Sequence, residues 1–518
     1  MKKTLVGQFI LFMIVVLILS MSATAAVGLE VDSAAVAAST GPVVEKTVLT
    51  KSGWQSVYVA VPPSALDSEG KAVAPAPVVE KIKPVAKNQT WLRFQSFIGV
   101  LMFLGIAYLM SNNKRAINWR TIGVGLALQL TMAFIVFRTQ AGLWIASGAR
   151  DFVAKLLSFT DAGASFMFGN LYAASDAAAK SMHSSGWRVL DAVSGQPIEL
   201  GMFFATHVLP TIIFFGSLMA VLYHLGIMQI VVGAFAWVMT RLMKTSGAES
   251  LSCSANIFLG QTEAPFLVKP FLGNMTNSEI MAVMTGGFAT VAGGVMAAYV
   301  RFGIDAGQLL TASVMNAPGA LVMAKLIFPE TGKAVTAEGS GKIKVDNLYS
   351  NVIDAAASGA SDGMKLAINV MAMLIAFIAL IAMLDGLLGW VGGFIGQPQI
   401  SIKILLGWMF APIAWGMGVQ SDEIIKVASL LGTKISINEF VAYIELAGLT
   451  DGLTARSVML ATFALCGFAN FSSIAIQVGG ISALVPERRT DLAAIGFKAM
   501  VAGALVNCTT AAIGGILF

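Results

Sequence analysis

The stretch Asn256–Pro265, N-I-F-L-G-Q-T-E-A-P, places two amides, a hydroxyl and a carboxylate inside a chain that is 57% hydrophobic and only 12% charged. The stretch is too short and too interrupted to cross a bilayer, although long apolar segments flank it on both sides. Polar side chains at membrane depth are costly and normally face a cavity, a pathway or a partner. Short segments interrupted by Gly and Pro point to the binding site of a transporter. The stretch therefore indicates a binding site inside a polytopic membrane protein.

The composition supports a membrane protein and argues against an enzyme. A mean hydropathy of +0.79 over 518 residues excludes an ordinary soluble protein. The three cysteines lie in apolar or small-residue segments, and the three histidines form no group with the spacing of a metal site. The sequence contains no H-E-x-x-H, no G-x-S-x-G and no Walker loop. We therefore expect no enzymatic activity and no nucleic-acid partner.

The first 90 residues differ in composition from the rest of the chain. Residues 1–25 have a basic start, the apolar core Phe9–Leu19 and the small-residue exit Ala23–Ala25, which predicts a signal peptide; an uncleaved membrane anchor is the alternative. Residues 26–90 are rich in proline, and we expect a flexible region. A signal peptide would place this region in the periplasm of a Gram-negative cell.

The apolar windows after residue 90 predict an all-α membrane protein with eight spanning helices. The windows are Phe94–Met110, Ile122–Phe137, Met202–Tyr223, Ile280–Val300, Ala306–Phe328, Leu366–Ile395, Ser457–Val478 and Leu492–Phe518. The first short loop, Ser111–Thr121, contains Lys114, Arg115 and Arg120 and no acid, so it is expected on the cytoplasmic side. Both termini are then periplasmic, in a protein of the bacterial inner membrane.

Three segments do not fit as spanning helices. Gly142–Phe168 mixes apolar and charged residues at helical spacing, which suits a helix lying in the membrane interface, and Ile227–Met243 has a similar character. Residues 169–200 suit an external loop or a short polar helix. The expected divisions of the chain are residues 1–25 and 26–90, the scaffold and interfacial helices 91–250, the first hairpin and repeat 251–328, the interfacial and scaffold helices 329–399, and the second hairpin and repeat 400–518.

The chain repeats one design in its two halves. In the first copy a polar segment with Glu263 precedes a span that contains the weak-helix sequence Gly287–Gly294. In the second copy Glu439 precedes a span that contains Cys466–Ser473. Non-helical backbone at membrane depth persists only where protein buries it or water reaches it, so we expect two re-entrant hairpins that enter from opposite faces. An inverted repeat of this kind holds its site at the repeat interface near mid-bilayer.

The polar residues of both copies allow several ligands. Glu263 and Glu439 occupy matching places, and two carboxylates facing one cavity can bind a polyhydroxylated ligand, bind a cation or move protons. The amide and hydroxyl of Gln261 and Thr262 suit the edge of a heterocyclic base, and Phe468 offers an aromatic face. Oxygen ligands suit a hard cation such as Na⁺. A purely structural use of the small residues, in close helix packing, is the alternative.

Four motifs in this order resemble the concentrative nucleoside transporter family. They are G-Q-T-E-A-P at Gly260–Pro265, G-G-F-A-T-V-A-G at Gly286–Gly293, N-E-F-V-A-Y at Asn438–Tyr443 and C-G-F-A-N-F-S-S-I at Cys466–Ile474. The resemblance covers about Phe94 to Phe518. It implies eight spanning helices, two re-entrant hairpins, interfacial helices and a homotrimer in the lipid bilayer.

The resemblance also implies a role for each motif residue. The nucleobase contacts would be Gly260, Gln261, Thr262, Glu263 and Val295. The ribose contacts would be Glu439, Asn470 and Ser473, with Phe468 packing beside the ligand. The Na⁺ ligands would be Asn256, Leu259, Thr290 and Val291, with Leu259 and Val291 acting through backbone carbonyls. The implied function is import of nucleosides by symport with Na⁺; the alternatives are coupling to protons and, from a different class, a gated nucleoside pore or sensor.

Overall fold

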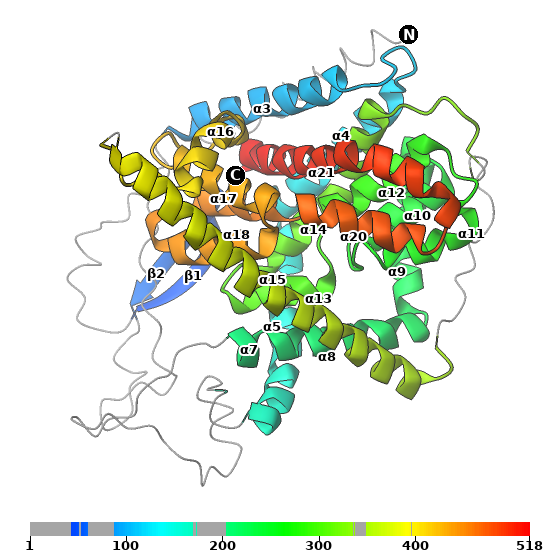
Figure 1. Ribbon diagram of the computed structural model, residues 1–518, viewed down its shortest axis with the longest axis horizontal. Coiled ribbons are helices and arrows are strands. Elements are labelled where there is room, and N and C mark those ends of the chain that lie inside the picture. The colour runs from blue at the N-terminus through cyan, green and yellow to red at the C-terminus, as the bar shows by residue number, and fades with distance from the viewer. Residues whose placement is uncertain are drawn as a thin grey trace.

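The computed structural model describes residues 43–50, 53–60, 88–168, 172, 204–334, 336, 349–394 and 396–518 (Figure 1). From Asn88 onward every described regular element is a helix, as the sequence predicts. The expected signal peptide lies outside the described residues. So does the expected loop at residues 169–200, except for Tyr172.

Two strands precede the helices. Strands β1 (Val43–Thr50) and β2 (Gly53–Ala60) pair antiparallel, with Val43 opposite Ala60. Both strands lie within residues 26–90, for which the sequence predicts a flexible region, and they precede the all-helical part of the chain. The two segments are rich in Val, Thr, Tyr and Trp, and β-branched and aromatic residues favour the extended backbone.

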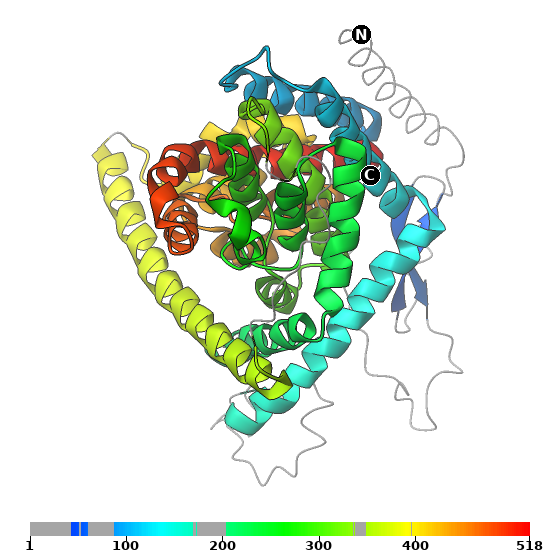
Figure 2. The ribbon, with the colours of Figure 1, turned by 90° about the vertical axis from the view of Figure 1, so that its right-hand side faces the viewer.

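Three long helices open the helical part of the chain. They are α3 (Gln89–Leu109), α4 (Trp119–Arg138) and α5 (Gln140–Phe168). Asn88 caps α3 and Asn118 caps α4, because each side chain accepts a hydrogen bond from a backbone N–H of the first turn. Helix α5 includes the segment expected in the membrane interface, and it extends along one side of the molecule, drawn in cyan in Figure 2.

The remaining described helices follow a similar order twice. The first series is α7 (Phe204–His207), α8 (Leu209–His224), α9 (Ile227–Met243), α10 (Gly247–Ala255), η3 (Ala264–Val268), α11 (Lys269–Leu272), α12 (Asn277–Ala289), α13 (Gly293–Arg301) and α14 (Ala306–Ile327). The second series is α15 (Val352–Phe394), α16 (Ile402–Met417), α17 (Ile424–Ser436), α18 (Glu439–Leu449), η4 (Thr450–Gly452), α19 (Ala455–Leu465), α20 (Phe471–Ser482), η5 (Pro486–Arg488) and α21 (Arg489–Leu517). In each series a pair of short helices precedes a broken helix, and a long helix ends the series.

Among the described residues, seven helical segments are long and apolar enough to cross a membrane. One of them, Asn277–Arg301, includes the break between α12 and α13. The eighth expected span, Ser457–Val478, is divided between α19 and α20, and each of these helices is too short to span alone.

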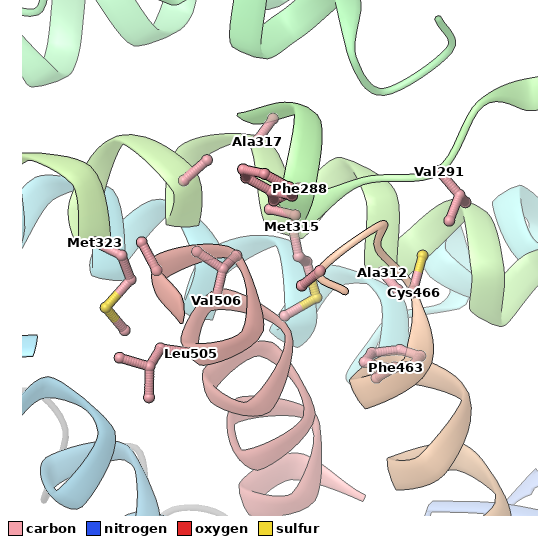
Figure 3. Close-up of a cluster of buried hydrophobic side chains, with 14 of the residues drawn as sticks. Phe288, Val291, Ala312, Met315, Ala317, Met323, Phe463, Cys466, Leu505 and Val506 are labelled. Carbon is pink, nitrogen blue, oxygen red and sulfur yellow. The ribbon is translucent and has the colours of Figure 1, made fainter. Parts of the chain in front are cut away.

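The core of the molecule includes α12 and α19, the first part of each broken helix. The hydrophobic spans of α14 and α21 are mostly buried, whereas that of α15 is mostly exposed. Figure 3 shows Phe288 of α12, Met315 of α14, Phe463 of α19 and Val506 of α21 gathered in one apolar cluster near Cys466. Helices α12 and α19 therefore both pack on the two long helices α14 and α21.

Helix α15 runs along the outside of the molecule, in yellow-green in Figure 2, and packs closely on α8. Glycines permit this approach: a Cβ on Gly359 would lie 2.6 Å from the carbonyl oxygen of Gly216, and a Cβ on Gly363 would lie 2.8 Å from the Cα of Ile213. Small residues allow backbones to approach where apolar helices meet in a membrane. The pair α8 and α15 is thus a packed unit beside the core.

Candidate functional site

The first break separates α12 from α13 at Thr290–Ala292. The polar stretch Asn256–Pro265 packs directly against this break, because the Gly293 N–H donates a 2.9 Å hydrogen bond to the Phe258 carbonyl. A side chain on Gly293 would lie 3.2 Å from that oxygen, so the close approach favours glycine. The backbone leaves the helix here with Thr290 in an extended conformation.

The second break separates α19 from α20 at Cys466–Asn470. Asn470 caps α20: its side-chain oxygen accepts a 2.8 Å hydrogen bond from the Ser473 N–H and another of 2.8 Å from the Ser472 hydroxyl. The cap holds Asn470 at a fixed position at the start of α20.

Two asparagines join the two breaks. Asn316 of α14 donates to the carbonyls of Ala289 and Cys466 at 2.7 and 2.9 Å, and Asn507 of α21 donates to the same two carbonyls at 2.7 Å each. Carbonyls at the end of a helix have no partner within it, so each break leaves acceptors that must be satisfied from outside. The buried asparagine pair satisfies one such acceptor at each break and holds the two breaks together.

A buried lysine completes this arrangement. The Lys434 ammonium of α17 donates to the side-chain oxygen of Asn507 at 2.6 Å and to the carbonyl of Ala464 at 2.8 Å. Only 1% of the Lys434 surface is exposed. Lys434, Asn316 and Asn507 were not predicted from the sequence. The signal that could have found them is a lone polar residue in a segment of small or apolar residues.

The residues expected to hold the ribose lie together in one hydrogen-bonded network. The Glu439 carboxylate, 4% exposed at the start of α18, accepts from Asn470 Nδ2 at 3.1 Å and from the Tyr299 hydroxyl at 3.0 Å. Ser473 is bonded to Asn470 through its backbone and accepts a 3.3 Å bond from Gln261 Nε2. A chain of hydrogen bonds thus runs from the polar stretch of the first series to Glu439 of the second.

Tyr299 and Gln477 belong to this network and were missed in the sequence. Gln477 of α20 is fully buried and donates to Gln261 Oε1 at 3.1 Å and to the Met284 carbonyl at 3.2 Å. Tyr299 of α13 packs its ring 4.3 Å from that of Tyr443. Hydrophobic periodicity gives no reason to choose either residue.

Glu263 lies in a different environment from Glu439. Its side chain is exposed and lines a cavity of about 500 Å³ together with Tyr223 of α8 and Asp362 of α15. Gly260 lies beneath it, since a Cβ there would meet the Glu263 carboxylate at 2.0 Å. The cavity lies between the α8–α15 pair and the polar stretch, and its size is typical of small-molecule sites.

Three other expected contact residues lie around these groups. The Thr262 methyl group faces α20, since a Cβ on Gly480 would lie 2.9 Å from it. Val295 of α13 is 3% exposed, and Phe468 is partly buried against the core. Gly260 and Thr262 line the cavity with Glu263, whereas Gln261 faces the network that contains Glu439.

The expected cation ligands lie around the first break. Asn256 is fully buried; its nitrogen donates to the Ser252 carbonyl at 3.0 Å, and its oxygen has no hydrogen-bond partner. The Thr290 hydroxyl donates to the Gly286 carbonyl at 2.9 Å and keeps its lone pairs available. Leu259 and Val291 follow these residues closely in the chain, on the polar stretch and in the break. A buried amide oxygen without a partner fits a hard cation, because such a cation prefers oxygen ligands.

Comparison with known proteins shows similarity over nearly the whole helical part. Residues 98–171 match the model "Na⁺ dependent nucleoside transporter N-terminus", residues 205–306 match "Nucleoside recognition", and residues 308–515 match "Na⁺ dependent nucleoside transporter C-terminus". An uncharacterised transporter of Haemophilus influenzae is 41% identical over 430 residues, which are 81% of this chain and 97% of that protein. Mouse sodium/nucleoside cotransporter 1 is 39% identical over 438 residues, which are 82% of this chain but only 63% of that longer protein.

Solved structures give the same result. CNTnw in an inward-facing substrate-bound state superposes with a TM-score of 0.74 at 40% identity, covering 82% of this chain and 98% of that chain. An outward-facing state of a CNTnw double variant gives a TM-score of 0.75 with the same identity and coverage. The resemblance seen in the four motifs is thereby confirmed. The chain belongs to the family of Na⁺-dependent, concentrative nucleoside transporters, which are transporters and not enzymes.

Proposed function

We propose that this transporter imports nucleosides across the bacterial inner membrane by symport with Na⁺. The observation that carries the proposal is the network from Gln261 through Ser473 and Asn470 to Glu439. It provides amide groups at one end and a buried carboxylate at the other. The hydroxyls of a ribose donate to carboxylates, and the edge of a nucleobase both donates and accepts.

Substrate binding would use the polar groups of the hydrogen-bonded network between Gln261 and Glu439. Glu439 would accept from the ribose hydroxyls in place of one of its present bonds, with Asn470 and Ser473 beside it. The nucleobase would meet Gln261, Thr262 and the other nucleobase contacts expected from the motifs. The cavity lined by Glu263, between the α8–α15 pair and the polar stretch, is the route by which we expect the nucleoside to reach these groups.

The coupling ion would bind at the first break. Asn256 and Thr290 would supply side-chain oxygens, and Leu259 and Val291 would supply carbonyls. Because the polar stretch and the break each contribute ligands, the ion would hold the stretch against α13 and complete the nucleobase site. Binding of Na⁺ and of nucleoside would then favour each other equally, as linkage requires.

The same proposal includes the arrangement of the helices in the membrane and their assembly. The segments Gly247–Leu272 and Ile424–Leu449 would be two re-entrant hairpins that enter from opposite faces, with α12/α13 and α19/α20 as the broken spans they meet. The α19/α20 pair would be the eighth span, and three copies would assemble through a fixed scaffold that includes α8 and α15. Both termini would be periplasmic.

Uptake into proteoliposomes tests the proposal. Labelled uridine is expected to accumulate against its gradient when an inward Na⁺ gradient is imposed without a pH gradient. Accumulation with a pH gradient alone would instead support proton coupling through Glu263 or Glu439. Equilibration without accumulation under either gradient would support a pore or a sensor.

Thr290→Ala is expected to raise the Na⁺ concentration for half-maximal uptake by about 10-fold, because one oxygen ligand, worth roughly 1.4 kcal/mol, is lost. The matched control is Thr462→Ala on α19, since the Thr462 hydroxyl also donates to the carbonyl four residues earlier and is equally buried. An unchanged Na⁺ requirement in Thr290→Ala would remove this residue from the cation site.

Tyr299→Phe is expected to raise the KM for uridine by about 10-fold, because Glu439 loses a charge-assisted hydrogen bond of roughly 1.5 kcal/mol that orients it. Tyr443→Phe is the control: its hydroxyl donates to the Thr462 carbonyl at 2.8 Å, and its ring is equally buried. Uridine kinetics are measured for both variants. Equal effects would mean that Tyr299 contributes only to packing and stability.

A further inference from the structure

The C-terminal ends of α12 and α19, the first parts of the two broken helices, differ in their hydrogen-bond partners. At α19, the Lys434 ammonium binds the Ala464 carbonyl in the last turn and the side-chain oxygen of Asn507. Both acceptors are neutral. A cation at the C-terminal end of a helix is stabilised by the partial negative charge of the unsatisfied carbonyls there.

At α12, the side-chain oxygen that corresponds to Asn507 Oδ1 has no hydrogen-bond partner. Asn316 donates to the same two carbonyls as Asn507, so the two asparagines occupy equivalent places in the two series. Asn507 Oδ1 accepts from Lys434, whereas Asn316 Oδ1 is buried without a partner. Asn256 Oδ1, one of the proposed cation ligands, is also buried without a partner. Buried acceptors of this kind are costly unless something satisfies them.

We propose that Lys434 is a tethered cation that takes, at the second break, the place that a free coupling ion takes at the first. The transporter then needs one Na⁺ per nucleoside, because the second cation position is filled by its own side chain. This inference rests on the proposed Na⁺ site at the first break.

The position of Lys434 connects its charge to the substrate site. Lys434 lies on α17, five residues before Glu439. Its ammonium bonds to Asn507, which donates to a carbonyl at each of the two breaks. Asn470 lies four residues after Cys466 and donates a hydrogen bond to Glu439. The Lys434 ammonium therefore stabilises the backbone that places Asn470 beside Glu439. A hydrophobic residue of similar length would fill the space but leave the Ala464 carbonyl and Asn507 Oδ1 unsatisfied.

The first test is the ion stoichiometry of the unaltered protein in proteoliposomes. The ratio of ²²Na⁺ to labelled uridine entering together is expected to be one. A ratio of two would overturn the proposal, since a second free ion would then be required. Uridine accumulation without any Na⁺ entry would contradict the proposed Na⁺ coupling itself, and the next experiment would still decide the role of Lys434.

The second test is chemical rescue of Lys434→Ala, which removes the atoms of an n-propylammonium ion. At a Na⁺ concentration that saturates the unaltered protein, uptake is expected to fall by about 10-fold or more. Added n-propylammonium, or a higher Na⁺ concentration that lets a second ion enter the space, is expected to restore it. With Na⁺ as the rescuer, the Hill coefficient for Na⁺ is expected to rise from about 1 toward about 2.

Lys434→Met is the matched control, because its side chain occupies the space that the added cation needs. It is expected to lose uptake and to show no rescue. The proposal is overturned if Lys434→Ala takes up uridine like the unaltered protein with no addition. It is also overturned if a Lys434→Ala protein that elutes like the unaltered protein in size-exclusion chromatography is restored by neither cation, or if Lys434→Met is restored equally well.

Discussion

Glu439→Gln is expected to lower the ratio of maximal uptake rate to KM for uridine by about 100-fold, because two charge-assisted hydrogen bonds of roughly 1.5 kcal/mol each are weakened. The carboxylate accepts from Asn470 and from Tyr299 and would accept from the ribose. An amide has one oxygen, and its NH₂ group would face another donor. The measurement is the initial rate of labelled uridine uptake into proteoliposomes as a function of uridine concentration.

A comparison of substrates separates ribose recognition from general damage. The unaltered protein is expected to prefer uridine over 2′- and 3′-deoxyuridine, and Glu439→Gln is expected to lose most of this preference for at least one of the two. Glu445→Gln is the control, because Glu445 lies on the same helix α18 but bonds to Lys403 and Thr433 instead. Normal uridine transport by Glu439→Gln would show that the ribose assignment is wrong.

Asn507→Ala is expected to lower the free energy of unfolding by about 3 kcal/mol or more, because it leaves the buried Lys434 charge short of a partner. The substitution also removes the hydrogen bonds that Asn507 donates to the carbonyls of Ala289 and Cys466 at the two breaks. We expect little or no uptake from this variant, since both broken helices lose their common support. Apparent melting temperature in detergent without Na⁺ gives the stability change.

Asn316→Ala is the matched comparison. Asn316 donates to the same carbonyls, but its own oxygen has no partner, so its loss leaves no charge unpaired. The expected loss of stability is smaller, about 1–2 kcal/mol, measured under the same Na⁺-free conditions. If the two variants lose equal stability, the Lys434–Asn507 bond contributes nothing beyond the asparagine pair.

Much of the helical fold could be predicted from the sequence. Apolar windows are long in this chain, and the seven long segments coincide with seven of the eight expected spans. The interruptions at Thr290 and at Cys466–Asn470 were also predictable, because β-branched residues, glycines and an N-capping asparagine are concentrated there. The strands β1 and β2 were not predicted, since two short segments in a Pro-rich region carry too little periodicity to decide.

The site could be predicted in part. Gln261, Glu439, Asn470 and Ser473 were chosen from motifs and lie in one hydrogen-bonded network. Their partners Tyr299 and Gln477 were not chosen, because a contact between residues 140 positions apart leaves no local pattern. The same holds for Asn316, Asn507 and Lys434: their roles depend on which carbonyls the two breaks leave free, and this is known only once the helices are packed.

The placement of Glu263 shows a further limit of sequence reasoning. Matching positions in the two copies suggested that Glu263 and Glu439 face one chamber. In the structure Glu263 lines the cavity beside α8 and α15, whereas Glu439 is enclosed by Tyr299 and Asn470. Gln261, only two residues from Glu263, points to the Glu439 network instead. A loop can present neighbouring side chains to different surroundings, so spacing alone does not say which of them meet.

A structure of the transporter with uridine and Na⁺ bound tests the central claim most directly. We expect the ribose within hydrogen-bond distance of Glu439, the base against Gln261 and its neighbours, and the ion between Asn256 and Thr290. Uridine bound where it touches neither Glu439 nor the polar stretch at residues 256–265 would contradict a single site between the two broken helices.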